Sequence, residues 1–380
     1  MKKILYITLI GIGLMIACNK KPQKTINNFK KQHKIIGYIG GFRGNFKAES
    51  IDAKKLTHIN YAFANVKRGK AILENRQDSS NLIELQKLKL VNPDLKILVS
   101  IGGWTWSKKF SKAALTDSSR KIFTKSAVDL LIKYKLDGID IDWEYPGQKG
   151  DNNDFRLEDK ENFTLFLNSL RVGLTQQGIK DSSHYLLTIA TGANQNYLDH
   201  TEMYKVHHYL DFINIMTYDF HGEWEDKTGH HTNLFTNDSS EISAEKAVLQ
   251  HVKAGVPIDK IVLGVAFYGR AWHKASNINH GLNQKAKIIP YHFHTTYDTI
   301  QNHLVNKNGY IRYWDSTAAA PFLYNDSLQL FVTYDDTMSI RKKCNFIKKM
   351  NMGGAMFWEY TEDSKNSNNR LLDVLDKNLK

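Results

Sequence analysis

Cysteine and proline are scarce in this chain of 380 residues, which has two cysteines and six prolines. A small fold held together by disulfides needs several cysteine pairs, so that class of protein is excluded. Proline-rich linkers and long low-complexity stretches are absent as well. With 42% hydrophobic and 24% charged residues, the composition is that of a globular protein with one large domain or two.

Acidic residues are also few relative to basic ones, 39 against 52, which gives a formal net charge of +13 at pH 7. Such an excess can indicate nucleic acid or anionic surfaces as partners. Here the lysines are scattered along apparent helices, with no arginine-rich stripe and no nucleic-acid-binding motif. We therefore interpret the charge as a solvated, lysine-rich surface and expect no nucleic-acid partner.

The N-terminus carries two lysines, an apolar run from Ile4 to Ala17 and then Cys18. The run is too short to span a bilayer comfortably and is typical of a secretory signal. Its end, LMIAC, resembles the lipobox of bacterial lipoproteins, in which the cysteine is lipidated. We expect a lipoprotein signal peptide at 1–17 and a polar tether at 18–33; a plain signal peptide cut near Ala17 is the alternative.

These features predict an exported protein, lipid-anchored to a bacterial membrane of the cell envelope and facing the periplasm or the surface. The membrane would be contacted only through lipidated Cys18. The second cysteine, Cys344, occupies an apolar position of a helical pattern, which predicts a buried core thiol.

Short apolar segments alternate with amphipathic ones from residue 34 onward. The predicted strands are 34–42, 58–66, 96–104, 138–146, 185–193, 212–220, 261–269 and 353–361. Apolar residues at three- and four-residue spacing predict helices at 81–91, 119–135, 159–174, 243–255 and 339–350. Strands alternating with helices indicate parallel pairing, and eight of them indicate an α/β protein with a closed (β/α)8 TIM barrel.

The interval between the seventh and eighth predicted strands, 270–352, is too long for a single helix. Segments 291–300, 309–315 and 328–336 in this interval are typical of strands and a short helix. We expect a small α+β insertion subdomain at 272–335 within one catalytic domain at 34–380.

One predicted strand, 138–146, carries Asp140, Asp142 and Glu144 in alternation with two isoleucines and Trp143. The alternation puts the three acids on the face that points into a barrel, with Glu144 nearest the mouth, and turns Trp143 outward toward the helices. Stacked acids share protons, which can keep Glu144 protonated near neutral pH, as a general acid requires. A metal site of hard oxygen ligands or a structural acid cluster is the alternative.

Histidines offer a competing interpretation, because His221, His230 and His231 cluster in one segment and His292 and His294 in another. Neither cluster has the spacing of a helical zinc motif or a nearby cysteine pair. We expect no metal and no other cofactor.

The acidic strand belongs to a wider resemblance. DGIDIDWEYP at 137–146 matches the DxxDxDxE signature of glycoside hydrolase family 18, the chitinases. SIGG at 100–103, MTYDFHGEW at 216–224, FYGRAW at 267–272 and GGAMFWEYTED at 353–363 resemble the family's motifs on strands three, six, seven and eight. WDSTAAAPFLYN at 314–325 is similar to the subdomain inserted in one branch. The resemblance runs from about residue 35 to the C-terminus.

The resemblance implies an enzyme that hydrolyses β-1,4-linked N-acetylglucosamine with retention of configuration. Such enzymes use the substrate's own 2-acetamido group as the nucleophile, an exception to the two-carboxylate scheme. Glu144 would be the general acid and then the base, and Asp142 would orient the acetamido N–H. Asp140 would share a proton with Asp142, and Tyr218 would donate its hydroxyl to the acetamido oxygen.

The resemblance also implies a sugar-binding cleft. Trp358 matches the tryptophan under the sugar at the cleavage point, and Trp104 and Trp224 match further stacking positions; core packing is the alternative for each. The other positions that match the pocket lining are Tyr38, Phe63, Gly103, Tyr145, Met216, Asp219, Tyr268 and Arg270. We expect the insertion to deepen the cleft into a groove and to add Trp272 and Trp314 as stacking residues.

Two other functions use the same barrel. An endo-β-N-acetylglucosaminidase acts on N-glycan cores, but the insertion and the FYGR segment favour the chitinase branch. A chitin-binding lectin characteristically lacks the catalytic acid, whereas Glu144 is present. We therefore expect chitin or chito-oligosaccharides as partners of a monomeric enzyme, with endo or exo action left open.

Overall fold

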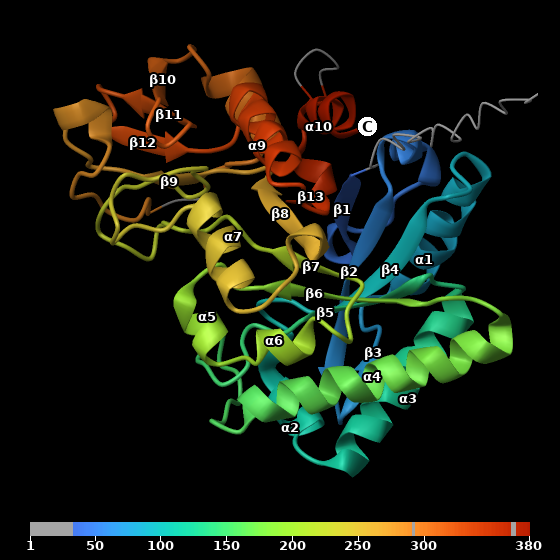
Figure 1. Cartoon of the computed structure of the whole chain (residues 1–380). Helices are drawn as coiled ribbons and strands as arrows, with labels where there is room; N and C mark the ends of the chain where they lie inside the picture. The colour runs from blue at the N-terminus through green and yellow to red at the C-terminus, as the bar shows by residue number, and fades with distance from the viewer. Residues whose placement is uncertain (1–32, 291–292, 366–369) are drawn as a thin grey trace, which may run out of the picture. The chain divides into compact units, whose positions relative to one another are not determined.

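The computed structural model describes residues 33–290, 293–365 and 370–380. Its main feature is a closed ring of parallel strands (Figure 1). The strands are β1 Lys34–Gly40, β2 His58–Lys67, β4 Lys96–Gly102, β5 Gly138–Asp142, β6 Leu186–Thr191, β7 Phe212–Ile215, β8 Ile261–Ala266 and β13 Gly354–Trp358. They neighbour one another in the order β1-β13-β8-β7-β6-β5-β4-β2, and pairing of β1 with β2 closes the ring. The predicted (β/α)8 barrel is confirmed.

The five predicted helices are present. They are α1 Asp78–Lys87, α3 Asp117–Tyr134, α4 Asp159–Asp181, α7 Ala244–Lys253 and α9 Thr337–Lys349. Among the described residues, four further α-helices were not predicted: α2 Phe110–Ala114, α5 Gln195–Asp199, α6 Met203–Val206 and α10 Leu371–Leu379. The first three span only four or five residues, too few for a helical repeat to be recognised.

Strand alternation divides the apolar residues into two layers. Inside the barrel, one cluster consists of Ile36, Tyr38, Ala62, Phe212, Val262 and Met356. Outward-facing residues such as Ile139 and Ile141 join the larger cluster between the barrel and the helices. Trp143 is 1% exposed, and its ring stacks on Phe110 with the centroids 5.3 Å apart, so it packs in the helix layer as predicted.

The insertion after β8 forms a second, antiparallel sheet in the order β10-β11-β12-β9, drawn in orange in Figure 1. Its strands are β9 Arg270–Trp272, β10 Tyr310–Asp315, β11 Ala320–Asn325 and β12 Leu330–Thr333, with the short helix α8 at Tyr297–Thr299. Its first strand begins at Arg270, a predicted site residue, so the insertion starts at the mouth of the barrel. A further short strand, β3 Lys70–Ile72, pairs antiparallel with β2.

The predicted signal peptide, Cys18 and nearly all of the tether lie outside the described residues. Within the described residues, no helix is both long enough and apolar enough to cross a bilayer. The second cysteine, Cys344, is fully buried on α9 as a free thiol, as predicted.

Candidate active site

The predicted acid column lies at the carboxyl end of β5. Asp140 and Asp142 are on the strand, 0% and 4% exposed, and Glu144 follows two residues after the strand ends, 8% exposed. Strand register places Asp140 beside Ser100 of β4 and Thr188 of β6. Three carboxyl groups are thus buried next to one another, where each disfavours ionisation of the next.

Asp140, the deepest acid, is held by donors from four other strands. Oδ2 accepts hydrogen bonds from the Tyr38 hydroxyl at 2.8 Å and from Ser100 Oγ at 2.7 Å. Oδ1 accepts from Thr188 Oγ1 at 2.5 Å and from Asn214 Nδ2 at 3.4 Å. Burial nevertheless raises the pKa of Asp140, because the loss of solvation outweighs these four donors.

Asp142 and Glu144 both resist ionisation. Burial raises the pKa of Asp142 well above its usual value, and the charges of Glu144 and Asp140 raise it further. Burial raises the pKa of Glu144 to about 7, with a hydrogen bond from Tyr145 acting against the rise and the charge of Asp219 adding to it. The outermost acid can therefore hold a proton near neutral pH, the state in which a carboxyl group can act as a general acid.

Glycines let the loop after β4 wrap closely around this strand end. Gly102 has φ +113°, and a Cβ there would lie 2.1 Å from the backbone oxygen of Asp142. Gly103 has φ +80°, and a Cβ there would lie 2.7 Å from the Phe63 ring. The Gly103 N–H donates to Asp142 O at 2.8 Å, and the Glu144 N–H donates to Ser107 Oγ at 2.9 Å. The loop therefore fixes the backbone on both sides of Asp142.

Trp358, at the end of β13, forms an aromatic floor beside the acids. Its ring stacks on Phe63 with centroids 5.5 Å apart, on Phe42 at 6.2 Å, and tilts against Tyr38 at 5.9 Å. Phe42 is 48% exposed and was missed by sequence reasoning. The available signal was that Phe42, the last residue of the predicted strand 34–42, follows two glycines.

Trp104 and Trp224 stand on the rim. Their exposed fractions are 52% and 58%, so core packing does not account for either of them. Trp104 lies edge-on to Tyr145 at 6.4 Å, and the Arg270 guanidinium lies 5.1 Å from the centroid of the Trp224 ring. Tyr145 and both tryptophans thus lie on loops after the barrel strands, where a polymer could reach them.

Asp219 organises the side of the site next to the insertion. Its Oδ1 accepts from the Tyr268 hydroxyl and from Arg270 Nε, each at 2.8 Å. Burial would raise the pKa of Asp219, but a partner at His231 and the charge of Arg270 lower it overall. Asp219 therefore stays ionised at pH values where Glu144 can still hold a proton.

Tyr218 and Met216 complete the lining between Asp219 and the barrel interior. Both are partly buried against the interior cluster. The Tyr218 hydroxyl donates only to Met356 Sδ, at 3.8 Å, within the described structure. Sulfur is a weak acceptor, so this hydroxyl remains available to a ligand.

The model of the family described as "Glycosyl hydrolases family 18" matches residues 34–363, which covers the barrel, the acid column and the insertion. The chain belongs to glycosyl hydrolase family 18. Two similar proteins of known name are chitinases. Chitinase A1 of Niallia circulans is 38% identical, covering 89% of this chain and 58% of the relative. Chitinase 1 of Aphanocladium album is 32% identical, covering 86% of this chain and 80% of the relative.

Solved structures of family 18 proteins match the whole barrel. A family 18 N-acetylglucosaminidase from Paenibacillus barengoltzii is 42% identical with a TM-score of 0.83, covering 91% of this chain and 99% of that one. Chitinase ChiA74 from Bacillus thuringiensis is 37% identical with a TM-score of 0.86, covering 92% of this chain and 70% of that one. The chain thus resembles known chitinases over most of its own length, while it spans only 58% of the length of chitinase A1.

The insertion carries the two tryptophans, Trp272 and Trp314, that were predicted to stack on sugar. Trp272 is 0% exposed and packs against Phe331 in the core of the insertion, so the prediction that it stacks on sugar is wrong. An apolar face of a three-residue strand cannot be told from a binding face in sequence. Trp314 is partly buried, and Arg312 lies 5.6 Å from its ring centroid.

Two histidines of the predicted clusters, His221 and His230, have acidic partners. His221 contacts Glu225 and Glu241, and His230 contacts Asp315 at 3.2 Å. His292 lies outside the described residues. Within residues 33–290, 293–365 and 370–380, no group of three or more His, Cys, Asp or Glu side chains is arranged so that it could hold a metal ion.

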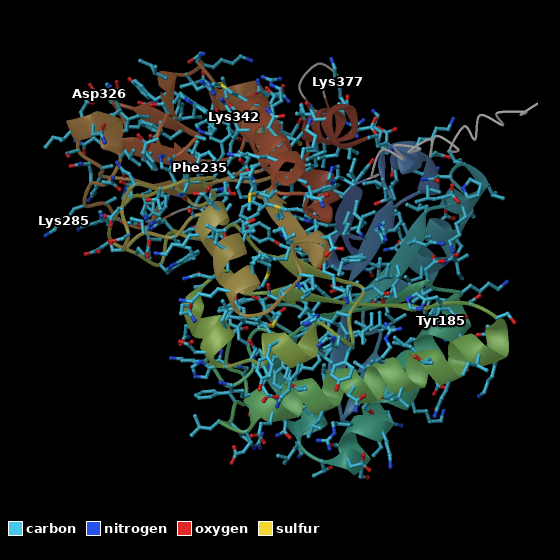
Figure 2. The ribbon with its side chains drawn as sticks, viewed as in Figure 1. Tyr185, Phe235, Lys285, Asp326, Lys342 and Lys377 are labelled. Atoms are coloured by element: carbon cyan, nitrogen blue, oxygen red, sulfur yellow. The ribbon has the colours of Figure 1, made fainter. Side chains whose placement is uncertain are left out.

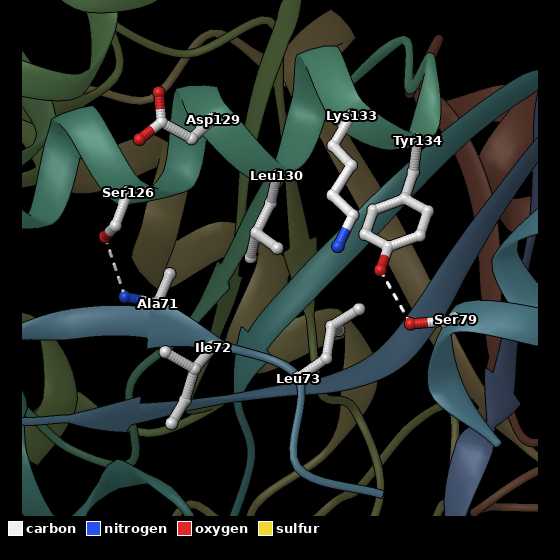
Figure 3. A pocket seen from close by; sticks show the side chains of 9 residues that line it. All are labelled: Ala71, Ile72, Leu73, Ser79, Ser126, Asp129, Leu130, Lys133 and Tyr134. Carbon is white, nitrogen blue, oxygen red and sulfur yellow. Dashed lines mark hydrogen bonds between the residues drawn. The ribbon is translucent and has the colours of Figure 1, made fainter. Parts of the chain in front are cut away.

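A hollow of about 360 Å³ lies outside the barrel, between β3, α1 and α3 (Figure 3). Some of its polar groups pair with one another: the Ala71 N–H donates to Ser126 Oγ at 2.9 Å, and Ser79 and Tyr134 share a hydrogen bond of 2.7 Å. None of the acid-column residues lines it. This hollow between a hairpin and two helices is therefore separate from the acid column.

Proposed function

We propose that this protein is a chitinase that cleaves β-1,4 linkages between N-acetylglucosamine units, acting as a monomer without a cofactor. The observation that carries the proposal is Glu144, a buried carboxyl group with a pKa of about 7 at the mouth of a family 18 barrel. It lies above Asp142 and within the same lining as the Trp358 floor. The chitinases among the relatives of this chain support the choice of substrate.

The mechanism we propose uses the substrate's 2-acetamido group as the nucleophile. Asp142 Oδ1 is buried and has no hydrogen-bond partner among the described residues, so it can accept the acetamido N–H. The Tyr218 hydroxyl can donate to the acetamido oxygen. Held in this way, the nucleophile attacks intramolecularly, an advantage worth about 7–11 kcal/mol in well-oriented models.

In the first step, the proton of Glu144 passes to the glycosidic oxygen as the bond from that oxygen to the anomeric carbon breaks. The acetamido oxygen bonds to the same carbon and forms a cyclic oxazolinium intermediate. In the second step, ionised Glu144 takes a proton from a water molecule, whose oxygen attacks the anomeric carbon and reopens the ring. Two displacements retain the configuration, and Glu144 ends protonated.

A second candidate is an N-acetylglucosaminidase that releases single sugars. It is favoured by the 42% identity to the Paenibacillus barengoltzii protein, which is described by that activity. Both candidates share the acid column, so product size rather than rate distinguishes them.

The experiment is product analysis by mass spectrometry with three substrates: chitohexaose, a high-mannose glycoprotein and the fully deacetylated glucosamine hexamer. We expect chitobiose and other short oligomers from chitohexaose and no cleavage of the other two substrates. Single sugars alone would instead establish the N-acetylglucosaminidase, glycan release would establish the endoglycosidase, and binding without cleavage a lectin. Rapid cleavage of the glucosamine hexamer would show that the nucleophile is a protein group.

A further inference from the structure

Trp224 is 58% exposed on the rim, so burial does not fix the position of its ring. Local contacts do. A Cβ at Gly222 would lie 2.2 Å from the indole, so the ring rests directly on the backbone of that glycine. On another side, the Arg270 guanidinium lies 5.1 Å from the ring centroid and pairs with Asp219 at 2.8 Å. The indole is held between a glycine and a fixed cation.

His221 fastens the turn that carries Trp224. Its Nδ1 lies 2.8 Å from Glu225 Oε2, and its Nε2 lies 2.8 Å from Glu241 Oε2. The Glu225 N–H donates to Gly222 O at 3.0 Å, which closes the turn around the tryptophan. His221 and Glu225 stand on either side of Trp224 in the sequence, and Glu241 belongs to a separate segment. The histidine therefore closes the turn on itself and ties it to its neighbour.

The histidine is itself confined. A Cβ at Gly229 would lie 2.5 Å from the His221 ring, and the His221 side chain is only 20% exposed. Lys227 Nζ lies 4.0 Å from Glu241 Oε1, on the far side of the bridge. Both carboxylates of the bridge therefore have fixed partners, and the ring has little room to take another orientation.

We propose that His221 is a positioning residue that holds Trp224 in place as a platform for a sugar beyond the one on Trp358. The inference rests on the proposed function and deepens it. A flexible turn would have to be ordered whenever a sugar stacks on the indole, and that ordering would weaken binding. The His221 bridge orders the turn before the substrate arrives.

The test is a double-mutant cycle of His221→Gln and Trp224→Ala, with kcat and KM measured on chitohexaose. Glutamine keeps one hydrogen bond but cannot bridge both carboxylates. We expect His221→Gln to raise KM by roughly 3- to 10-fold, the range that corresponds to ordering one or two side chains on binding. kcat should not change, and the substitution should add nothing in the Trp224→Ala background, because its effect passes through the indole.

The matched control is His184→Gln, which removes an exposed histidine paired with Asp211 at 2.6 Å outside the site. This control substitution should leave both kcat and KM on chitohexaose unchanged. If His221→Gln does not fold, Glu241→Ala removes one arm of the same bridge and is expected to raise KM as well.

Binding of chitohexaose, measured by calorimetry in a Glu144→Gln background, tests the inference without turnover. If the wild-type protein does not cleave chitohexaose, the proposed function fails, while the effect of His221→Gln on Kd still decides the inference. An unchanged KM and Kd, a loss confined to kcat, or a KM effect of the same size in the Trp224→Ala background would each overturn it.

Discussion

At the residue scale, Glu144 and Asp219 are adjusted in opposite directions by their surroundings. Burial raises the pKa of Glu144 to about 7, and the charge of Asp219 adds to the rise. Asp219 is partly exposed, and the His231 and Arg270 side chains beside it lower its pKa. One carboxyl group can therefore deliver a proton while the other keeps a negative charge that helps the first to retain it.

This arrangement predicts how activity depends on pH. Glu144 must be protonated, so kcat/KM should fall as pH rises through about 7. Asp219→Asn removes a charge that raises the pKa of Glu144, so the falling limb should move to lower pH, by about half a unit to one unit. The measurement is the pH profile of kcat/KM on chitohexaose. Asp238→Asn, in an exposed segment, is the control; a limb that stays in place or moves to higher pH in Asp219→Asn would contradict the account.

Site residues that stand together in a sequence motif could be predicted, whereas single residues contributed by separate strands could not. The acids and the tryptophans stand in recognisable motifs, and the structure brings them to one end of the barrel. Besides Tyr38, Asp140 accepts hydrogen bonds from Ser100, Thr188 and Asn214, which come from three different strands. Thr188 and Asn214 are single polar residues inside apolar segments, and only the strand register brings them to the acid.

At the element scale, a buried ion pair ties helix α9 to the barrel. Lys343 Nζ donates to Asp335 Oδ2 at 2.6 Å and to Thr232 Oγ1 at 2.7 Å, and the Lys343 and Asp335 side chains are 0% and 1% exposed. Asp335 Oδ2 also accepts the Ala266 N–H at the end of β8, at 3.3 Å. In the sequence, Lys343 is one of three consecutive basic residues, which gave no reason to expect that one of them is buried.

Lys343→Met should be strongly destabilising, because it leaves the Asp335 charge buried without its partner. Breaking a buried pair in this way costs about 3–5 kcal/mol of unfolding free energy. The measurement is urea unfolding. Lys342→Met is the matched control, because the neighbouring Lys342 is exposed on α9 and its replacement should change stability by less than about 0.5 kcal/mol. Equal stabilities for the two variants would contradict the role given to this pair.

Strand starts were predicted better than strand ends. The sixth predicted barrel strand, 212–220, begins correctly but ends at Ile215 in the structure. Residues 216–220 continue the apolar and aromatic pattern because Met216 and Tyr218 pack against the cluster inside the barrel, although they do not pair as a strand. Sequence patterns record apolar character, and they do not distinguish a strand from the binding loop that follows it.

At the scale of the whole molecule, the excess positive charge is spread over the outside. Lys285, Lys342 and Lys377 are exposed and lie on three separate elements or loops (Figure 2). We propose that the protein is exported and attached to a bacterial membrane through lipidated Cys18.

Cys18→Ser should release the protein from the membrane fraction or leave it as an unprocessed precursor, because more than one acyl chain is needed for stable anchoring. The measurement is fractionation of cells that express the chain with its own leader. Cys344→Ala is the control; burial raises the pKa of the Cys344 thiol to about 12, so this cysteine is unreactive. A wild-type chain found in the soluble fraction would rule out the anchor.

The most direct test of the central claim is the turnover of Glu144→Gln on unactivated chitohexaose, with binding measured alongside by calorimetry. Glutamine keeps the shape of Glu144 but cannot deliver a proton, so kcat should fall by about 10²–10⁴ or more while Kd is retained. Glu158→Gln, an exposed acid before α4, should behave as wild type. Near-wild-type turnover of a folded Glu144→Gln variant would contradict the assignment of Glu144 as the general acid.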